Sequence, residues 1–229
     1  MNKALYNLFI GLKNSDIQYF LLTDFEAELN SRDIDLYIDA GSRYKFEKII
    51  YELGWYKRKE LPYHLNHHFF LSPQSNLYLD VKFELSFTSA PYKCHTYYYA
   101  EEAMKHSFFN EKGIRRPGAY GAVLLYAAHL AFKERGKLES KHGNLLADYI
   151  RDFEIQHRHL PVEIVQIQNW LKKDFPLKTN ALQEILHPYF RHENKRMVRQ
   201  KKKYNIGWGA KVLFLGTDGA GKSTLIEAV

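Results

Sequence analysis

Apolar residues recur at helical intervals twice in the first hundred positions. The first set predicts an amphipathic helix near the N-terminus, with Gly11 close to its expected end; its apolar positions are Ala4, Leu5, Leu8, Phe9 and Leu12. The second set predicts a helix that begins at the N-cap candidate Ser42 and ends at Gly54. The apolar positions of this second helix are Phe46, Ile49, Ile50 and Leu53.

Between and after these helices the pattern changes to the alternation typical of strands. Residues 17–22 form a short apolar run. In residues 32–39 every second residue is apolar, with Ile34, Leu36 and Ile38 on one face and Asp33, Asp35, Tyr37 and Asp39 on the other. Residues 67–71 and 77–87 predict two more strands joined by a turn at 72–76. In the last strand Leu77, Leu79, Val81, Phe83 and Leu85 alternate with Tyr78, Asp80, Lys82 and Glu84.

From about residue 100 the period is helical again. Residues 118–132 are apolar almost all round, which predicts a buried helix. Further helices are predicted at Leu145, Leu146, Tyr149 and Phe153, at Pro161 with Val162, Val165 and Trp170, and at Ala181, Leu182, Ile185 and Leu186 before Pro188. The pattern therefore favours an α+β domain followed by a helical bundle.

Composition is that of a folded protein in a reducing compartment. The 229 residues are 45% hydrophobic and 15% aromatic, which is enough for a sizeable core. The single cysteine, Cys94, cannot form an internal disulfide. The N-terminus lacks the pattern of a signal peptide, and no apolar run has the length of a membrane span. We expect a cytoplasmic protein without a membrane partner.

The net charge of +7 is concentrated in one segment. Residues 191–204 carry seven Lys or Arg and one Glu, so the rest of the chain is nearly neutral at +1. A basic run of this kind is more typical of a solvated helix or linker than of a nucleic-acid surface. We therefore do not expect nucleic acid to be the partner.

The strongest motif lies near the C-terminal end of the sequence. Gly216-Thr217-Asp218-Gly219-Ala220-Gly221-Lys222-Ser223-Thr224 fits the phosphate-binding pattern G-x-x-x-x-G-K-[ST], after an apolar strand-like run at 212–215. Backbone N–H groups of such a loop surround phosphate oxygens. Lys222 would contact the β- and γ-phosphates, and the Ser223 hydroxyl would hold Mg²⁺. ATP and Mg²⁺ are the expected cofactors.

This loop resembles that of thymidylate kinase-like P-loop kinases. The matching residues are Phe214, Gly216, Asp218, Gly219, Gly221, Lys222, Ser223 and Thr224. The family usually has an acidic residue where this chain has Leu215. The resemblance implies phosphoryl transfer from ATP, with Lys222 catalytic, to a small acceptor such as a nucleotide. Only seven residues follow Lys222, so we expect the front of a longer protein.

Three carboxylates form the second candidate site. Asp33 and Asp35 share one face of a predicted strand, and Asp80 lies on the polar face of a later strand. Convergent carboxylates of this kind can hold metal ions that align a triphosphate. The order of elements, with Arg32-Asp-Ile-Asp-Leu36 and Leu79-Asp-Val81, resembles the polymerase-β-type nucleotidyltransferase superfamily. The resemblance implies that Asp33, Asp35 and Asp80 are catalytic and bind Mg²⁺.

One departure leaves the role of these carboxylates open. The superfamily usually has Gly-Ser after its first strand, where this chain has Leu21-Leu-Thr-Asp-Phe25. Thr23 offers a hydroxyl but not the close backbone approach of glycine. Active transfer, a binding-only domain and ordinary surface carboxylates therefore remain three interpretations.

Other candidates are weaker. His64, His67 and His68 are interpreted as surface histidines rather than a metal site, because adjacent strand positions point apart and no cysteine accompanies them. His129, Lys133 and Lys137 are spaced to share one helix face, where they would contact triphosphate oxygens or simply form a polar edge. Cys94 has His95 beside it in sequence, but neighbours in a strand point apart, so Cys94 is not interpreted as a nucleophile.

Together these patterns predict an α+β nucleotidyltransferase-like domain over 1–105, a helical bundle and basic linker over 106–205, and the start of an α/β P-loop kinase domain over 206–229. The main hypothesis is an ATP-dependent phosphotransferase acting on a nucleotide or another small-molecule acceptor. The alternatives are a nucleotidyltransferase that transfers NMP to a small molecule or protein, and a nucleotide-sensing module without enzymatic activity. The oligomeric state is left open.

Overall fold

The structure, a computed structural model, describes residues 3–22, 33–58, 66–72, 77–89, 93–133, 137–138, 140–173 and 177–194. All of these belong to one compact unit, Met1–Met197. The second unit, Val198–Val229, lies outside the described residues, and so does the predicted P-loop. The described unit mixes helices and strands, as the sequence predicts. Each of its helices is too short or too polar to cross a bilayer.

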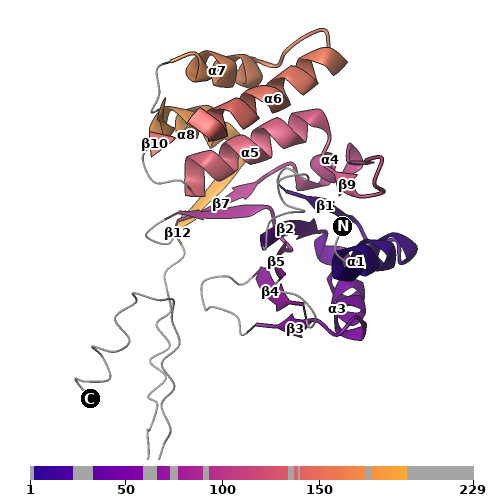
Figure 1. Ribbon diagram of the computed structural model, residues 1–229. Helices are drawn as coiled ribbons and strands as arrows, with labels where there is room; N and C mark the ends of the chain where they lie inside the picture. Colours follow the sequence, from indigo (N-terminus) through magenta and orange to yellow (C-terminus); the bar gives the residue numbers. More distant parts are fainter. Residues whose placement is uncertain are drawn as a thin grey trace, which may run out of the picture. The chain divides into compact units, whose positions relative to one another are not determined.

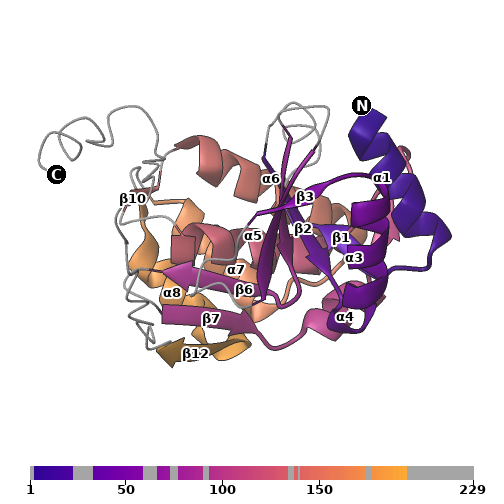
Figure 2. The ribbon, with the colours of Figure 1, turned by 90° about the horizontal axis from the view of Figure 1, so that it is seen from below.

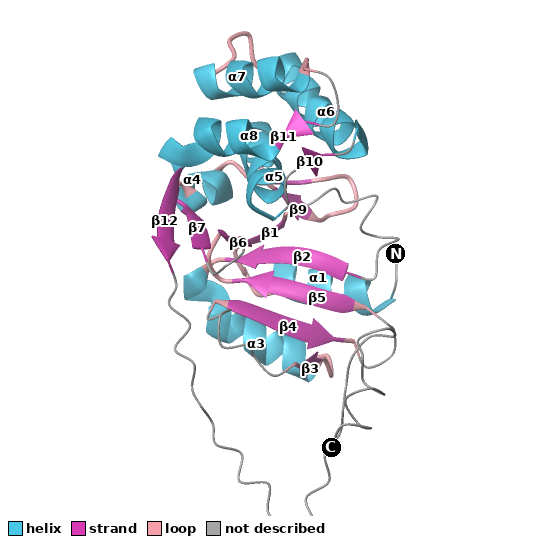
Figure 3. Cartoon of the chain, turned by 90° about the vertical axis from the view of Figure 1, so that its left-hand side faces the viewer, coloured by secondary structure: helices cyan, strands magenta, loops and turns pink. Residues whose placement is uncertain are grey.

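A five-stranded sheet organises the N-terminal half (Figures 1 and 3). The order across the sheet is β1 (Tyr19–Leu21), β2 (Asp33–Ile38), β5 (Tyr78–Lys82), β4 (His67–Leu71) and β3 (Tyr56–Lys57). Only β2 and β5 are parallel; the other neighbours are antiparallel. The parallel pair places residues from two distant segments side by side at the centre of the sheet.

One face of this sheet is covered by α1 (Lys3–Asn14) and α3 (Arg43–Glu52), which lie beside it in Figure 1. Together they form the sheet core, a cluster of buried residues that includes Leu5, Leu8, Leu36, Phe46 and Leu79. The predicted apolar faces of both helices and of β2 supply this cluster, so the amphipathic pattern was correct here.

The C-terminal half contains four long helices. They are α5 (Ala119–Lys133), α6 (Ser140–Gln156), α7 (Val162–Leu171) and α8 (Thr179–Leu186). Their inward residues form the bundle core, which includes Val123, Leu124, Ile164, Leu182 and Leu186. The prediction of an all-round apolar helix at 118–132 is confirmed, because nearly every residue of α5 from Val123 to Phe132 is buried in this core.

A second, three-stranded antiparallel sheet belongs to the bundle core (Figure 2). Its order is β12 (Phe190–Asn194), β7 (Lys93–Tyr97) and β6 (Ser86–Ser89). Phe87, Tyr97 and Phe190 are buried against the helices. The first residues of the predicted basic linker therefore form a strand, whereas residues 195–204 lie outside the described residues.

The remaining elements are short. They are η1 (Ala40–Ser42), α4 (Ala100–Lys105), the pair β8 (Phe108–Phe109) and β9 (Arg115–Arg116), the pair β10 (Lys137–Leu138) and β11 (Leu177–Lys178), and η2 (His187–Tyr189).

One predicted element end was wrong. α1 continues through Gly11 to Asn14, and the missing side chain of Gly11 lets this helix approach α3: a Cβ at residue 11 would lie 3.0 Å from Ile49 Cγ2. The predicted start of α3 is confirmed, because Ser42 is its N-cap residue, but the Ser42 side chain makes no capping bond. Its Oγ accepts a hydrogen bond from the Gln18 N–H at 3.3 Å instead. The predicted end at Gly54 is correct, and its φ of 77° is the left-handed conformation that glycine tolerates.

The long strand predicted at 77–87 is also wrong. It breaks at Phe83–Leu85, and its two halves, β5 and β6, belong to different sheets. Alternation continues across the break because Phe83 is buried in the sheet core whereas Leu85 and Phe87 are buried in the bundle core. An apolar pattern does not reveal which of two cores each residue enters.

Candidate active site on the central sheet

The two faces of the sheet differ in chemistry. Ile34, Leu36 and Ile38 of β2 are buried toward α1 and α3 in the sheet core. Asp35 and Tyr37 project from the opposite face, because successive side chains of a strand alternate. Tyr37 and Phe20, whose rings lie 5.0 Å apart, pack into the bundle core. Asp35 lies two positions from Tyr37 on this same face.

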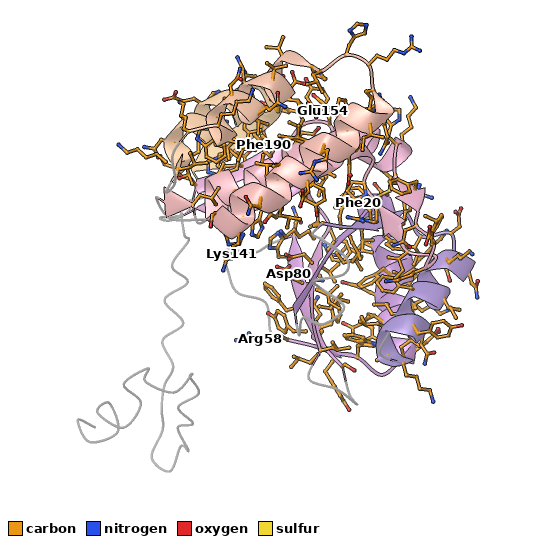
Figure 4. All side chains as sticks on the ribbon, turned by 45° about the horizontal axis from the view of Figure 1, so that its top comes forward. Phe20, Arg58, Asp80, Lys141, Glu154 and Phe190 are labelled. Carbon is orange, nitrogen blue, oxygen red and sulfur yellow. The ribbon has the colours of Figure 1, made fainter. Side chains whose placement is uncertain are left out.

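The parallel pairing of β2 and β5 brings two of the predicted carboxylates together. Asp35 is the register partner of Asp80, and Asp33 is the partner of Tyr78. Residues in register on adjacent strands present their side chains on the same face, so Asp35 and Asp80 are neighbours. Figure 4 shows Asp80 on the central strands. Asp33 has the same strand parity as Asp35, but its side chain lies outside the described residues.

Both carboxylates are largely withdrawn from solvent. The side chain of Asp35 is 16% exposed and that of Asp80 is 12% exposed. Adjacent carboxylates at this depth repel each other and lose hydration, so their charged forms require cations nearby.

Lys82 provides one such cation. It follows Asp80 by two positions on β5 and is the register partner of Tyr37. Its Nζ lies 4.0 Å from Asp35 Oδ1 and 5.1 Å from the centre of the Phe87 ring. Its side chain is only 1% exposed. A lysine this deeply buried keeps its charge only beside an anion, and the ring face adds a favourable cation–π interaction.

His67 provides the second potential cation. It is the register partner of Lys82 on β4, and its Nδ1 lies 3.9 Å from Asp80 Oδ1. Phe69 and Tyr78 stack beside it with centroids 5.4 Å apart. The face therefore presents carboxylates, a lysine and a histidine, bordered by aromatic rings.

The interpretation of the histidines as surface residues was wrong for the two that the structure describes. His67 and His68 are both buried, but on opposite faces of the sheet. His68 lies on the α3 side, with Nδ1 3.0 Å from Glu47 and Nε2 2.9 Å from Arg43. Arg43 can only donate, so the proton of the neutral His68 ring is on Nδ1. His64 lies outside the described residues.

The prediction that His129, Lys133 and Lys137 share one helix face was also wrong. α5 ends at Lys133, and Lys137 belongs to β10. His129 is half-buried in α5, with its ring parallel to that of Tyr126 at 6.1 Å. The side chains of Lys133 and Lys137 lie outside the described residues. Cys94 is buried in β7, with Sγ 3.9 Å from Thr96 Oγ1.

Sequence reasoning overlooked Lys82 and His67 as members of the site. A signal for Lys82 was present, because it shares the strand parity of Asp80. His67 could not be assigned, because its register against β5 depends on a pairing of distant segments. The P-loop residues Gly216, Thr217, Asp218, Gly219, Ala220, Gly221, Lys222, Ser223 and Thr224 lie outside the described residues.

The donor chemistry of the face suits a hard divalent cation. Carboxylate oxygens are the ligands that Mg²⁺ prefers, and Asp35 and Asp80 supply them from adjacent strands. Within the described residues no group of three His, Cys, Asp or Glu side chains is placed to hold a metal ion. The Asp33 carboxylate, the predicted third ligand, is not among those side chains.

Comparisons with known proteins do not identify a family for this chain. No protein-family model matches the sequence, and no curated protein matches it. Among solved structures the fold is similar to the solution structure of the antibiotic-resistance factor ANT(2'')-Ia, with 15% identity and a TM-score of 0.42. The match covers 67% of this chain and 84% of that chain. A likeness at this level assigns neither a function nor a shared site.

Proposed function

We propose that the described unit is a nucleotidyltransferase that transfers NMP from a nucleoside triphosphate to a hydroxyl group of a small molecule. The observation that carries the proposal is the register of Asp35 opposite Asp80, on the sheet face away from α1 and α3. Asp33 shares the strand parity of Asp35, and in this proposal its carboxylate is the third ligand. The paired central strands would then supply three carboxylates to one oxygen-rich site.

In the proposed reaction the acceptor oxygen forms a bond to the α-phosphorus while the bond from that phosphorus to pyrophosphate breaks. The hydroxyl proton passes to Asp80, which lies beside His67. Asp33 and Asp35 would hold Mg²⁺, which when bound offsets charge on the triphosphate. Lys82 maintains the orientation and charge of Asp35 through their 4.0 Å contact.

The first strand favours a binding-only role as the second candidate. The Leu22 N–H donates to the Asp35 carbonyl at 3.1 Å, and the Leu22 side chain is buried in the bundle core. This N–H is therefore committed to the sheet, at the place where the related superfamily uses Gly-Ser to approach the triphosphate. Nucleotide binding without transfer is the outcome that this feature favours.

The test incubates the full chain with α-labelled nucleoside triphosphates, Mg²⁺ or Mn²⁺ and pooled hydroxyl-bearing small molecules. Release of pyrophosphate with labelled product is expected for the wild type, and Asp35→Asn and Asp80→Asn should abolish it. The control is Asp148→Asn, since Asp148 is exposed on α6 and forms a surface ion pair with Arg151 at 3.0 Å.

Melting temperature separates the remaining outcomes. If Mg²⁺ with nucleotide raises the melting temperature of the wild type but not of Asp35→Asn, and no product forms, the unit is a binding module. If neither transfer nor stabilisation occurs, the carboxylates form a structural ion network and the proposal is wrong.

The P-loop motif supports a separate proposal of ATP binding by residues 216–224. Lys222→Ala should remove most of that affinity, because the lysine supplies the positive charge that contacts the phosphates. Calorimetric titration of ATP–Mg²⁺ into the full chain and the variant measures this. Lys141→Ala, an exposed lysine on α6, is the control. Equal affinities for the wild type and Lys222→Ala would refute the assignment.

A further inference from the structure

A second pocket lies within the C-terminal half, lined by residues of α4, α5 and α6 and by segments before α7 and at η2. Its volume is about 760 Å³, which is in the range of small-molecule sites. Asp35, Asp80, Lys82 and His67 are not among its lining residues, so it is distinct from the carboxylate face.

Aromatic rings form much of the wall. Tyr97 and Tyr99 meet edge to face at 5.7 Å, and Tyr99 lies 6.3 Å from Tyr189. Tyr120, also in the lining, lies 6.1 Å from Phe153. Four tyrosine rings with phenylalanine offer π faces to a ligand, and such faces attract organic cations.

A buried carboxylate lies beside two of these tyrosines. Glu163, at the start of α7, is 9% exposed. Tyr120 donates its hydroxyl proton to Glu163 Oε1. Burial and the nearby Glu163 raise the pKa of Tyr189 to about 12, so its hydroxyl keeps its proton. The sequence pattern did not reveal Glu163, because it assigned Val162 to the buried face of this helix. In the structure Val162 is 70% exposed and Glu163 is buried.

The hydrogen bond from Tyr120 to Glu163 determines what this part of the pocket can recognise. A tyrosine hydroxyl has one proton, and once that proton is donated to Glu163 the oxygen can only accept from a ligand. Tyr120 thus presents an acceptor, and Glu163 adds negative charge behind it. A ligand that satisfies this oxygen must bring an N–H or O–H donor or a positive charge.

The formal charges around the pocket point the same way. None of the described residues that line it is Lys or Arg, although the chain has a net charge of +7. The charged lining group is Glu102, whose Oε1 lies 2.6 Å from His106 Nε2. His157, the other lining histidine, stacks on Phe153 at 4.2 Å.

From the rings, the Tyr120 acceptor and the acidic balance, we propose that this pocket binds an organic cation, an ammonium group attached to an apolar body. The site does not depend on the proposed nucleotidyltransferase activity. The ammonium contacts the tyrosine faces and the Tyr120 oxygen, while the apolar body fills the space beside Ala119 and Phe153.

The test compares two probes of equal shape, 4-phenylbutylamine, which is protonated at pH 8, and neutral 4-phenylbutanol. Titration calorimetry with the full chain should show at least tenfold tighter binding of the amine. Glu163→Gln should bring the two affinities toward equality, and Tyr120→Phe should weaken the amine more than the alcohol. The matched controls, Glu52→Gln and Tyr44→Phe, change exposed residues of α3 and should leave both affinities unchanged.

Ala119→Phe locates the binding site, because it fills the pocket from the first residue of α5 and should remove binding of both probes. NMR contacts between the amine and tyrosine ring protons of the wild type locate it without any substitution. Equal affinity for amine and alcohol, no saturable binding of the amine, or unchanged binding by a folded Ala119→Phe variant would each overturn the proposal.

Discussion

At the scale of the residue, Lys82 is a buried charge that depends on its neighbours. An ammonium that is 1% exposed beside Asp35 cannot be hydrated, so removing it leaves a carboxylate poorly compensated. Lys82→Met should lower the free energy of unfolding by about 3 kcal/mol, measured by urea denaturation. Mg²⁺ should recover part of this loss if the carboxylates bind it.

Lys48→Met is the control for this substitution. Lys48 is 69% exposed and lies 3.9 Å from Glu52, and a surface pair of this kind contributes less than about 1 kcal/mol. Equal destabilisation by the two substitutions would show that Lys82 is not part of a charge network.

His95 predicts a dependence of stability on pH. Burial, together with the neighbouring charges of His192, Lys93 and His187, lowers its pKa from 6.5 to about 4. Phe132 stacks on the ring at 3.9 Å, and Glu184 and Glu193 line the adjacent pocket. The unfolded chain therefore binds the proton first, so the stability due to neutral His95 is complete above pH 6.5 and is lost as the pH falls toward 4.

Urea midpoints measured between pH 7 and pH 4 test this dependence. His95→Gln should flatten the curve between these values, whereas His159→Gln, at an exposed position, should leave it unchanged. A wild-type curve without slope in this range would contradict the assignment.

At the scale of the element, α1 and α3 depend on the absence of a side chain at Gly11. Alanine normally favours a helix over glycine by about 1 kcal/mol, but here its Cβ would lie 3.0 Å from Ile49 Cγ2. Gly11→Ala should therefore destabilise the protein by about 1 kcal/mol. In an Ile49→Ala background the same substitution should become stabilising.

Gly121 in α5 gives the comparison. A Cβ there would meet Pro117 and Ala103 at ordinary distances of 3.5 and 3.6 Å. Gly121→Ala should therefore raise the urea midpoint, because alanine favours the helix and its Cβ meets no clash there. If both substitutions stabilise, α1 and α3 are not in close contact at residue 11.

Elements that sequence periodicity predicted well are those whose pattern is local. β2 and α5 are examples, since each presents a consistent face to its core. β7 and β12 were missed because their pairing joins residues such as Cys94 and Glu193, and a run of mixed polar residues shows no period before its partner is known. The break between β5 and β6 was missed because apolar residues alternate with polar ones in the same way whether they enter one core or two.

At the scale of the whole molecule, β1 connects the two cores. Tyr19 and Leu21 enter the sheet core, whereas Phe20 and Leu22 enter the bundle core. If β1 left one core, the side chains that it buries in the other core would be exposed as well. We therefore expect the described unit to unfold in a single transition.

The tryptophans provide probes of this cooperativity. Trp55 is buried in the sheet core and Trp170 in the bundle core, each 3% exposed. In a Trp208→Phe background, Trp170→Phe leaves Trp55 as the fluorescent reporter and Trp55→Phe leaves Trp170. Each transition is to be compared with the circular dichroism of the same variant. Fluorescence and circular dichroism should agree in both, and a separate transition for either reporter would show that the cores unfold independently.

The candidate site was predicted in part. Asp33, Asp35 and Asp80 could be selected because strand parity and residue type are visible in one dimension. The contacts of Lys82 and His67, and the Glu163 cluster of the second pocket, depend on how strands and helices meet in three dimensions. The transfer activity and the metal ligands stay predictions until the experiments above are done.

The pairing of β12 with β7 also has a consequence for synthesis on the ribosome. β7 is translated almost a hundred residues before the strand that covers its edge, and Phe190 enters the bundle core last. Until residues 190–194 leave the exit tunnel, the nascent chain presents an open strand edge to other chains. Slow translation of the Lys and Arg codons that follow would prolong that exposure, whereas a chaperone bound at β7 would shorten it.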